Sequence, residues 1–310
     1  MRAAVIEGER VRFVPDYPDP RPLSGEVLIR VKLVGICGTD LELLRGYKGF
    51  SGVPGHEFVG VAQSGKYAER RVVGEINVGC GECEFCRAGV RGHCLRREVV
   101  GLTRDGAMAE PVAIPEENLH PVPDEVPDEA AVFTEPLAAA LRVLESARVR
   151  PRDRVVVLGA GRLGQMVARV LALTGCRLTV IDRNDWKLGL LRGLGAELRS
   201  SAEGIENAAD MVVECTGRPE GLKTALRLVK PMGTVVLKST TAEGAEVDPS
   251  LVVKEVRVVG SRCGPFEPAI SLLRRGLVGV DDLISSIYPL ERVEEAFEEA
   301  SRSMKVLLRV

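Results

Sequence analysis

The hydrophobic positions of the chain follow two different patterns, which meet at an acidic, proline-rich connection over residues 115–129. Downstream of it, nearly continuous hydrophobic runs alternate with segments of helical periodicity, which predicts a parallel sheet covered by helices on both faces. Upstream, glycine and proline separate short β-branched runs, which predicts strands joined by turns; these runs cover residues 2–8, 26–36, 58–62 and 69–76.

The downstream pattern predicts an ordered series of elements. A helix is expected to begin near Pro136, and a buried strand at 154–158 leads through a glycine-rich turn into a second helix. Strand, helix and strand then repeat, and the chain closes with two helices and a strand. The remaining predicted elements cover 176–182, 184–196, 209–217, 221–229, 233–239, 255–261, 266–278, 290–304 and 305–310.

The glycine-rich turn, GAGRLG, predicts a dinucleotide site because it joins a strand to a helix. Gly159 permits the tight turn, Gly161 lets a pyrophosphate approach the backbone, and Gly164 lets helix and strand pack closely. Arg162 and Leu163 begin the helix, whose free N–H groups favour phosphate.

An acidic residue stands at the end of the second strand, where it would bind the ribose 2′-hydroxyl of the nucleotide. This residue, Asp182, favours NAD because a 2′-phosphate would meet its carboxylate. The adjacent Arg183 could accommodate that phosphate, so NADP stays open.

Composition argues against several partners. The 310 residues carry a net charge of -2, with 45% hydrophobic and 28% charged residues, which gives no electrostatic reason to expect nucleic acid or a membrane surface. No signal peptide and no apolar stretch of about 18 residues is found, so we expect a cytoplasmic protein. Cytoplasmic thiols stay reduced, so clustered cysteines predict a metal site and not disulfides.

Four cysteines within fifteen residues predict a zinc site without an open position. Cys80, Cys83, Cys86 and Cys94 have the spacing C-x2-C-x2-C-x7-C. Four thiolates complete a tetrahedral shell, so this zinc would be structural.

A second, dispersed set combines one cysteine, one histidine and two carboxylates. Catalytic zinc uses such ligands and keeps a position for water or substrate. From the residues alone this set is only suggestive, because a cysteine or a histidine can equally be part of a core. Its members are Cys37, His56, Glu57 and Glu135.

In this order the motifs GICGTD, PGHEFVG, the four cysteines, DGAMAE, TEPLA and GAGRLG resemble the zinc-containing medium-chain dehydrogenase/reductase superfamily. Its members include alcohol, sorbitol, threonine and archaeal glucose dehydrogenases. The resemblance implies an α/β fold with a mainly β, GroES-like catalytic domain at 1–134, which includes a zinc lobe at 78–97. A Rossmann NAD(P)-binding domain is implied at 135–268, with a return to the catalytic domain at 269–310.

The resemblance also implies a reaction: hydride transfer between a secondary alcohol or polyol and NAD(P), with two zinc ions per chain. Cys37, His56, Glu57 and Glu135 would hold the catalytic zinc. Thr39 would touch the substrate oxygen. Glu42 stands where relatives often have a histidine that passes the proton outward, so the proton would leave through Glu42, the ribose hydroxyls or water. The other implied cofactor contacts are Lys187 with the ribose, Lys305 with the pyrophosphate, and Thr216, Gly217 and the segment from Leu237 to Ser239.

Other interpretations stay open. The chain is shortened over 58–79, and Glu42 departs from the family pattern, which leaves room for a non-catalytic NAD sensor. A zinc-free quinone or enoyl reductase of the same superfamily and a zinc-dependent nucleic-acid binder are further alternatives. We expect a homodimer or homotetramer that acts on a small alcohol or carbonyl substrate.

Overall fold

The structure, a computed structural model, describes residues 1–239 and 249–310. The chain forms two compact units, one of Met1–Glu135 together with Phe266–Val310, the other of Pro136–Pro265. Helix α9 (Phe266–Arg274) begins at the second division, so the whole helix belongs to the first unit. The bounds expected from the sequence were 134 and 268.

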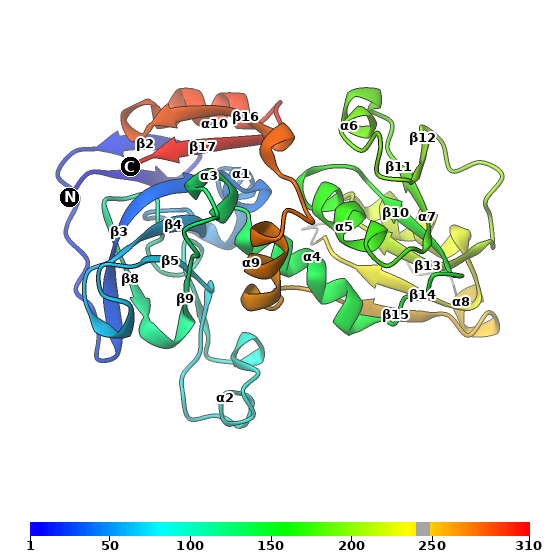
Figure 1. Cartoon of the computed structure of the whole chain (residues 1–310), viewed down its shortest axis with the longest axis horizontal. Coiled ribbons are helices and arrows are strands. Elements are labelled where there is room, and N and C mark those ends of the chain that lie inside the picture. Colours follow the sequence, from blue (N-terminus) through cyan, green and yellow to red (C-terminus); the bar gives the residue numbers. More distant parts are fainter. Residues whose placement is uncertain (240–248) are drawn as a thin grey trace. The chain divides into compact units, whose positions relative to one another are not determined.

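The first unit is built on a mainly antiparallel sheet with the order β16-β17-β3-β4-β5-β9 (Figure 1). Strand β8 pairs with the first half of β3, along the edge whose other half pairs with β17. The closing strand β17 lies against β3, and Leu307 faces Gly35. On the other side of β3, Gly35 faces Glu57. The strands are β3 (Glu26–Gly35), β4 (Glu57–Ala62), β5 (Arg71–Gly74), β8 (Pro111–Pro115), β9 (Leu119–Pro121), β16 (Ile284–Pro289) and β17 (Lys305–Arg309).

This register gathers residues that are far apart in sequence. One end of β3 leads into Cys37, the paired end of β4 begins with Glu57, and β17 begins with Lys305. Because adjacent strands lie about 4.8 Å apart, their terminal residues become neighbours. The sheet therefore positions the candidate metal site.

Smaller elements complete the first unit. A hairpin of β1 (Ala3–Glu7) and β2 (Arg10–Val14) packs with α10 (Val293–Ala300) in the hydrophobic core. Short helices α1 (Gly38–Leu43) and α3 (Asp128–Ala131) follow β3 and β9. A pair of strands, β6 (Asn77–Val78) and β7 (Glu98–Val99), closes the base of the segment that holds the four cysteines, which contains α2 (Glu84–Arg87).

The second unit has the parallel sheet that the sequence pattern predicts. Its strand order is β12-β11-β10-β13-β14-β15, the order of a Rossmann fold. The strands are β10 (Arg154–Leu158), β11 (Arg177–Ile181), β12 (Glu197–Arg199), β13 (Ala209–Glu214), β14 (Val229–Leu237) and β15 (Arg257–Gly260); the helices are α4 (Thr134–Ser146), which begins in the first unit, α5 (Arg162–Ala172), α6 (Asp185–Gly189), α7 (Pro219–Leu228) and α8 (Ser250–Val253).

One predicted helix is much shorter than expected. The segment 184–196 was predicted to be helical, but α6 covers only Asp185–Gly189. Gly193 and Gly195 have φ angles of 86° and 76°, which a right-handed helix cannot contain. The two glycines turn the chain toward β12.

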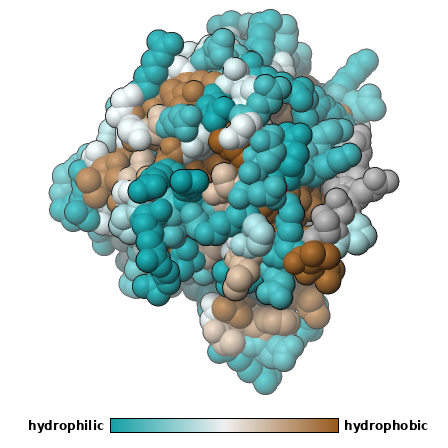
Figure 2. Space-filling view, turned by 90° about the vertical axis from the view of Figure 1, so that its right-hand side faces the viewer, coloured by the Kyte–Doolittle hydropathy of each residue, from teal (hydrophilic) through white to brown (hydrophobic). Residues whose placement is uncertain are grey.

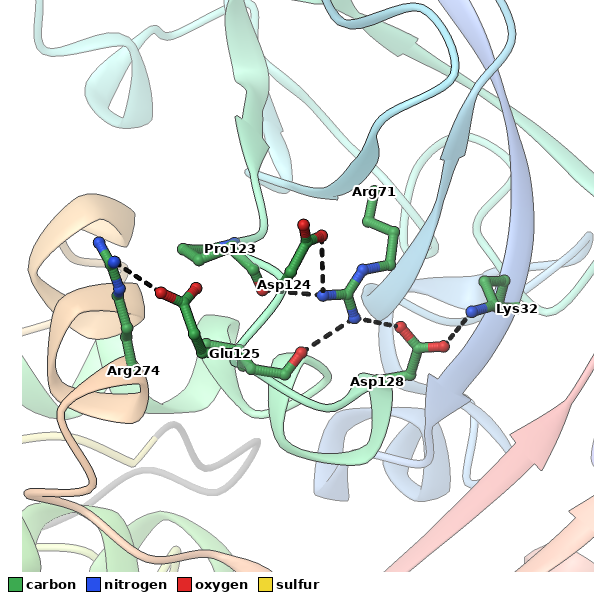
Figure 3. A network of polar contacts seen from close by, with 8 residues as sticks. Lys32, Arg71, Pro123, Asp124, Glu125, Asp128 and Arg274 are labelled. Atoms are coloured by element: carbon green, nitrogen blue, oxygen red, sulfur yellow. Dashed lines mark hydrogen bonds and ion pairs between the residues drawn. The ribbon is translucent and has the colours of Figure 1, made fainter.

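A polar network fixes the proline-rich segment that precedes α3 (Figure 3). The Arg71 guanidinium donates to the carbonyl oxygens of Pro123 and Val126 at 2.8 and 2.9 Å, and to Asp128 Oδ1 at 2.9 Å. Lys32 pairs with the other Asp128 oxygen. One arginine of β5 thus provides hydrogen bonds to two carbonyl oxygens and one carboxylate of a segment that forms no strand pairing there.

Among the residues that the structure describes, every helix is too short or too polar to cross a bilayer.

Candidate active site

Three of the four predicted catalytic ligands lie together in the first unit. The side-chain donor atoms of Cys37, His56 and Glu57 all fall within 4.8 Å of one another. His56 and Glu57 are 4% and 2% exposed, whereas Cys37 is only half-buried. The cluster is thus enclosed on one side and reachable on the other.

A buried aspartate, which the sequence did not point out, stands behind His56. Asp40 is fully buried, and its Oδ2 accepts the backbone N–H of Cys37 at 2.7 Å. Its Oδ1 lies 3.6 Å from His56 Nδ1, and neither atom has a hydrogen-bond partner among the described residues. A carboxylate beside one ring nitrogen leaves the other free for a ligand, as around metal-binding histidines.

The charges around His56 suit a cation. Burial alone would lower the pKa of His56, but the negative charges of Asp40 and Cys37 outweigh it and raise this pKa well above the ordinary value. Burial raises the pKa of Asp40 despite the opposing effect of His56. The same negative surroundings would attract a metal ion, which binds the imidazole once its proton has left. The donor set of thiol, imidazole and carboxylate therefore fits zinc.

Glu57 has a second partner within the unit. Its carboxylate pairs with Lys305, which is 3% exposed. The Lys305 ammonium also lies 3.5 Å from the Ile36 carbonyl oxygen and 5.5 Å from the centre of the Phe133 ring. These are its described contacts in the first unit, and the pyrophosphate contact expected for Lys305 stays a prediction.

The other predicted residues of this site lie at its margin. Glu135, in the first turn of α4, is outside the three-residue cluster, although its charge is among those that raise the pKa of His56. Thr39 Oγ1 lies 3.7 Å from Cys37 Sγ. Glu42 is on the exposed side of α1, where its carboxylate pairs with Arg45 at 2.6 Å.

The four clustered cysteines have the geometry of a tetrahedral sulfur site. Their sulfur atoms lie within 4.8 Å of one another and form no disulfide. Sulfurs around zinc, with Zn–S distances of about 2.3 Å, stand about 3.8 Å apart. The Cys83–Cys86 and Cys80–Cys86 distances are 3.5 and 4.0 Å, so the site fits zinc.

Backbone amides and one arginine prepare this lobe for negative charge. Hydrogen bonds from the backbone of Glu82 and Cys83 lower the pKa of the Cys80 thiol to about 6. Arg96 donates to Cys80 Sγ at 3.4 Å. Burial raises the pKa of Cys86 to about 11, so this sulfur needs a cation to become a thiolate.

The second unit contains the dinucleotide turn in the predicted context. Gly159 has a φ of 98°, and an added Cβ would lie 3.0 Å from the Cys215 carbonyl oxygen. A Cβ on Gly164 would lie 1.9 Å from the Gly159 oxygen, whereas the space beside Gly161 is open. Helix α5 begins with Arg162 and Leu163, so its free amides follow this opening directly.

The predicted acid holds the turn in shape. Asp182 follows β11, and its two oxygens accept the backbone N–H groups of Ala160 at 2.7 Å and Asn184 at 2.9 Å. Gln165, which is fully buried and was not predicted, donates to the carbonyl oxygens of Ala160 and Lys187. Arg183 is exposed beside the half-buried Asp182, and Lys187 lies in α6.

The remaining predicted cofactor residues follow β13 and β14. Thr216 and Gly217 come after β13, and Leu237 ends β14, followed by Ser239. Two buried charged residues stand among them: Glu214, which the sequence did not point out, and Lys238, which lies inside the expected segment from Leu237 to Ser239. Lys238 donates to the carbonyl oxygens of Ala139 at 2.6 Å and Arg262 at 2.8 Å, which ties the ends of β14 and β15 to α4.

Comparison with known families covers nearly the whole chain. Residues 23–124 match the alcohol dehydrogenase GroES-like domain, and residues 129–310 match the glucose dehydrogenase C-terminus family.

Individual relatives agree with this result. The chain is 32% identical to an erythritol/L-threitol dehydrogenase of Mycolicibacterium smegmatis, with 99% of this chain and 97% of the relative covered. It is 34% identical to an L-threonine 3-dehydrogenase of Streptomyces coelicolor, with 99% of each covered. The first alignment has 351 positions against 310 residues here, so that relative carries segments that this chain lacks.

A solved structure shares the fold over the full length. The short chain alcohol dehydrogenase (rspB) of Escherichia coli CFT073, complexed with NADH, superposes with a TM-score of 0.92 at 29% identity. The alignment covers 100% of this chain and 99% of that one.

The fold and the alcohol or polyol oxidoreductase interpretation are thereby confirmed over the alternatives of an NAD sensor and of a quinone or enoyl reductase. The chain belongs to the zinc-type medium-chain dehydrogenase/reductase superfamily, with a GroES-like domain followed by a Rossmann domain.

Proposed function

We propose that the protein is a zinc-dependent dehydrogenase that oxidises a secondary alcohol or polyol with NAD, in a reversible reaction. The observation that carries the proposal is the buried cluster of Cys37, His56 and Glu57, with Asp40 behind the imidazole. The same chain holds a complete dinucleotide turn with its acid. Polyol and amino-alcohol dehydrogenases among the relatives support the substrate class.

In this proposal Cys37 and His56 hold the catalytic zinc, Glu57 is a direct or exchangeable ligand, and Glu135 contributes directly or through water. A bound zinc ion supplies Lewis acidity toward a substrate oxygen, and bound nicotinamide supplies the hydride chemistry. The protein's part is to orient these groups. Asp40 holds His56 in the tautomer that leaves the ligand nitrogen unprotonated.

Thr39 and Glu42 are the proposed proton carriers. The Thr39 hydroxyl lies beside Cys37 and can both donate and accept, so it can take a proton from an alcohol bound there. Glu42 is exposed, which suits a group that passes the proton to water.

NAD is the proposed cofactor. Both Asp182 oxygens are fixed by backbone amides, so the carboxylate cannot swing away from a 2′-phosphate. Lys187 and Lys305 are proposed contacts of the adenosine ribose and the pyrophosphate. Neighbouring structures carry NADH or NADP and so do not distinguish the two cofactors. We propose NAD because of Asp182.

A second zinc ion is proposed for the cysteine lobe, where it would have a structural role. The sulfur distances and the amides around Cys80 support it. Four sulfur ligands leave no position for substrate.

A homodimer or homotetramer in the cytoplasm is proposed for the assembled protein. The hydropathy view in Figure 2 shows a mostly hydrophilic face interrupted by separate hydrophobic patches. Edge strand β15 carries Val258, which is 41% exposed, and Val253 in α8 is 87% exposed. An exposed valine on an edge strand and another in α8 support contact between copies.

Steady-state assays test the proposal. Purified protein is screened against polyols, amino alcohols and simple secondary alcohols with NAD and with NADP. It is then dialysed against a chelator and reassayed with and without added zinc. We expect NAD-linked oxidation that disappears on chelation and returns with zinc. Full activity after the catalytic zinc is removed would contradict the proposal.

A further inference from the structure

The end of strand β13 carries a buried carboxylate that neither the motifs nor the proposed chemistry uses. Glu214 is the last residue of the strand and is 3% exposed. Buried carboxylates are costly unless their oxygens accept several hydrogen bonds. The partners of Glu214 therefore indicate what this residue does.

All three described donors to Glu214 come from residues predicted to line the cofactor. Oε1 accepts the Thr216 backbone N–H at 2.6 Å and also the Thr216 hydroxyl. Oε2 accepts the Ser239 hydroxyl, and Ser239 Oγ in turn accepts the Gly217 backbone N–H at 3.0 Å. One side chain thus joins the loop after β13 to the loop after β14.

The joined loops pack directly on the dinucleotide turn. A Cβ on Gly159 would meet the Cys215 carbonyl and the Thr216 nitrogen at 3.0 and 3.1 Å. On the other side, a Cβ on Gly221 in α7 would lie 2.3 Å from both Glu214 Oε1 and Thr216 Oγ1. A shift of the loop would therefore disturb the turn and the start of α7 together.

We propose that Glu214 is a positioning residue of the dinucleotide site, which holds the Thr216–Gly217 loop and Ser239 in the arrangement that binds NAD. The inference rests on the proposed cofactor, but it concerns a residue that does not touch it. In parallel α/β sheets ligands bind beyond the carboxyl ends of the strands, and Glu214 stands at that edge.

Asp210 offers a matched control at the opposite end of the same strand. Its carboxylate accepts the Arg154 backbone N–H at 2.8 Å and pairs with Lys230, so it also fixes a neighbouring chain segment. Because Asp210 lies at the amino end of β13, removing its carboxylate should lower the melting temperature without affecting the cofactor loops.

NADH dissociation constants are measured by fluorescence for wild type, Glu214→Gln, Glu214→Ala and Asp210→Asn, with zinc content and melting temperature as parallel readouts. Glutamine keeps one acceptor oxygen, so we expect the NADH dissociation constant to rise by about threefold to tenfold in Glu214→Gln and by more in Glu214→Ala. The KM for NAD should follow, while kcat at saturating NAD stays within about threefold. Asp210→Asn should bind NADH like wild type.

The inference is overturned if the Glu214 variants bind NADH within twofold of wild type, or if Asp210→Asn weakens binding equally. If Glu214→Ala does not fold, Glu214→Gln carries the test alone. A wild type that binds NADH but oxidises no alcohol would refute the proposed function while the binding comparison still decides the role of Glu214. A wild type that binds neither NADH nor NADPH refutes both.

Discussion

The two ligand clusters of the first unit differ in how the chain builds them. The four cysteine sulfurs come from residues 80–94, on short turns at the edge of the unit, and backbone amides supply much of their electrostatic support. The cluster of Cys37, His56 and Glu57 comes from two strand ends, is mostly buried, and is surrounded by the charged side chains of Asp40 and Lys305.

This difference separates a site that completes a metal shell from one that leaves it incomplete. Four thiolate ligands on one short segment can be held in a fixed arrangement by the metal alone. Three mixed ligands at strand ends are brought together by the sheet itself, and three ligands leave one position of a tetrahedral zinc shell open. The first cluster should therefore affect stability, and the second should affect turnover.

The largest effect is expected for Cys37→Ser. Removing the thiolate takes away a ligand that the alcohol chemistry requires, so kcat/KM should fall by at least about 10³-fold. Thermal stability and NADH affinity should stay close to wild type, because the sheet and the second unit are untouched. Cys176→Ser, which removes a cysteine outside both clusters, is the control. Retained activity in Cys37→Ser would contradict a catalytic role for this cluster.

The opposite pattern, a loss of stability with activity retained, is expected for Cys94→Ser. Cys94 is fully buried, and losing one of four ligands should empty the lobe of zinc. We expect the melting temperature to fall by about 5–10 °C, as measured by differential scanning fluorimetry. Activity per folded molecule, measured well below that transition, should change less than threefold. A loss of activity as complete as in Cys37→Ser would mean that the two clusters are not separate in function.

A smaller effect is expected when the support of His56 is changed. Asp40→Asn keeps an acceptor for the Cys37 amide but removes the charge beside His56. The affinity of the catalytic site for zinc should fall by about tenfold to a hundredfold, measured by competition with a chromogenic chelator. Asp105→Asn is a suitable control, because Asp105 also accepts a backbone amide, that of Val53 at 2.8 Å. Equal zinc affinity in both variants would show that Asp40 does not support the ligand.

The smallest effect concerns a charge outside both clusters. Burial would raise the pKa of Asp128, but hydrogen bonds from Lys32 and Arg71 outweigh it and lower this pKa below 3.8. A carboxyl group whose pKa is lowered by folding stabilises the folded state at pH values above its ordinary pKa. This stabilisation is lost as the pH falls through the lowered pKa. Asp128→Asn should therefore cost about 1–2 kcal/mol at pH 7.

Urea denaturation of wild type and Asp128→Asn at several pH values measures that contribution. Acid release of zinc affects both proteins alike, so their difference reports Asp128. The difference should shrink below pH 4 and vanish once the wild-type carboxyl is protonated. A difference that stays constant to pH 2.5 would show that packing, and not charge, is responsible.

Sequence reasoning worked best where the chemistry is local. The alternation of strands and helices in the second unit and the glycine turn follow from periodicity and from one contiguous motif. The motif order also pointed to Cys37, His56 and Glu57. Asp40 and Glu214 had no such signal, and Lys238 was included only as part of a segment, because the importance of these residues depends on burial and on partners up to about a hundred residues away.

The helix predicted over 184–196 shows a second limit of sequence patterns. Its hydrophobic spacing suits a helix, but α6 ends at Gly189, and the positive φ angles of Gly193 and Gly195 do not allow a helix over the rest of the segment. Lys305 shows a third limit, because its pairing with Glu57 arises from the register of β17 against β3, which no local pattern reveals.

Zinc content per chain, measured by mass spectrometry on protein purified without chelator, tests the division between the two clusters most directly. Wild type, Cys37→Ser and Cys94→Ser are compared at equal protein concentration. The account predicts about two zinc ions in wild type and about one in each variant, with activity lost in Cys37→Ser and stability lost in Cys94→Ser. One zinc ion in wild type that Cys37→Ser leaves in place would contradict a catalytic zinc at Cys37, His56 and Glu57.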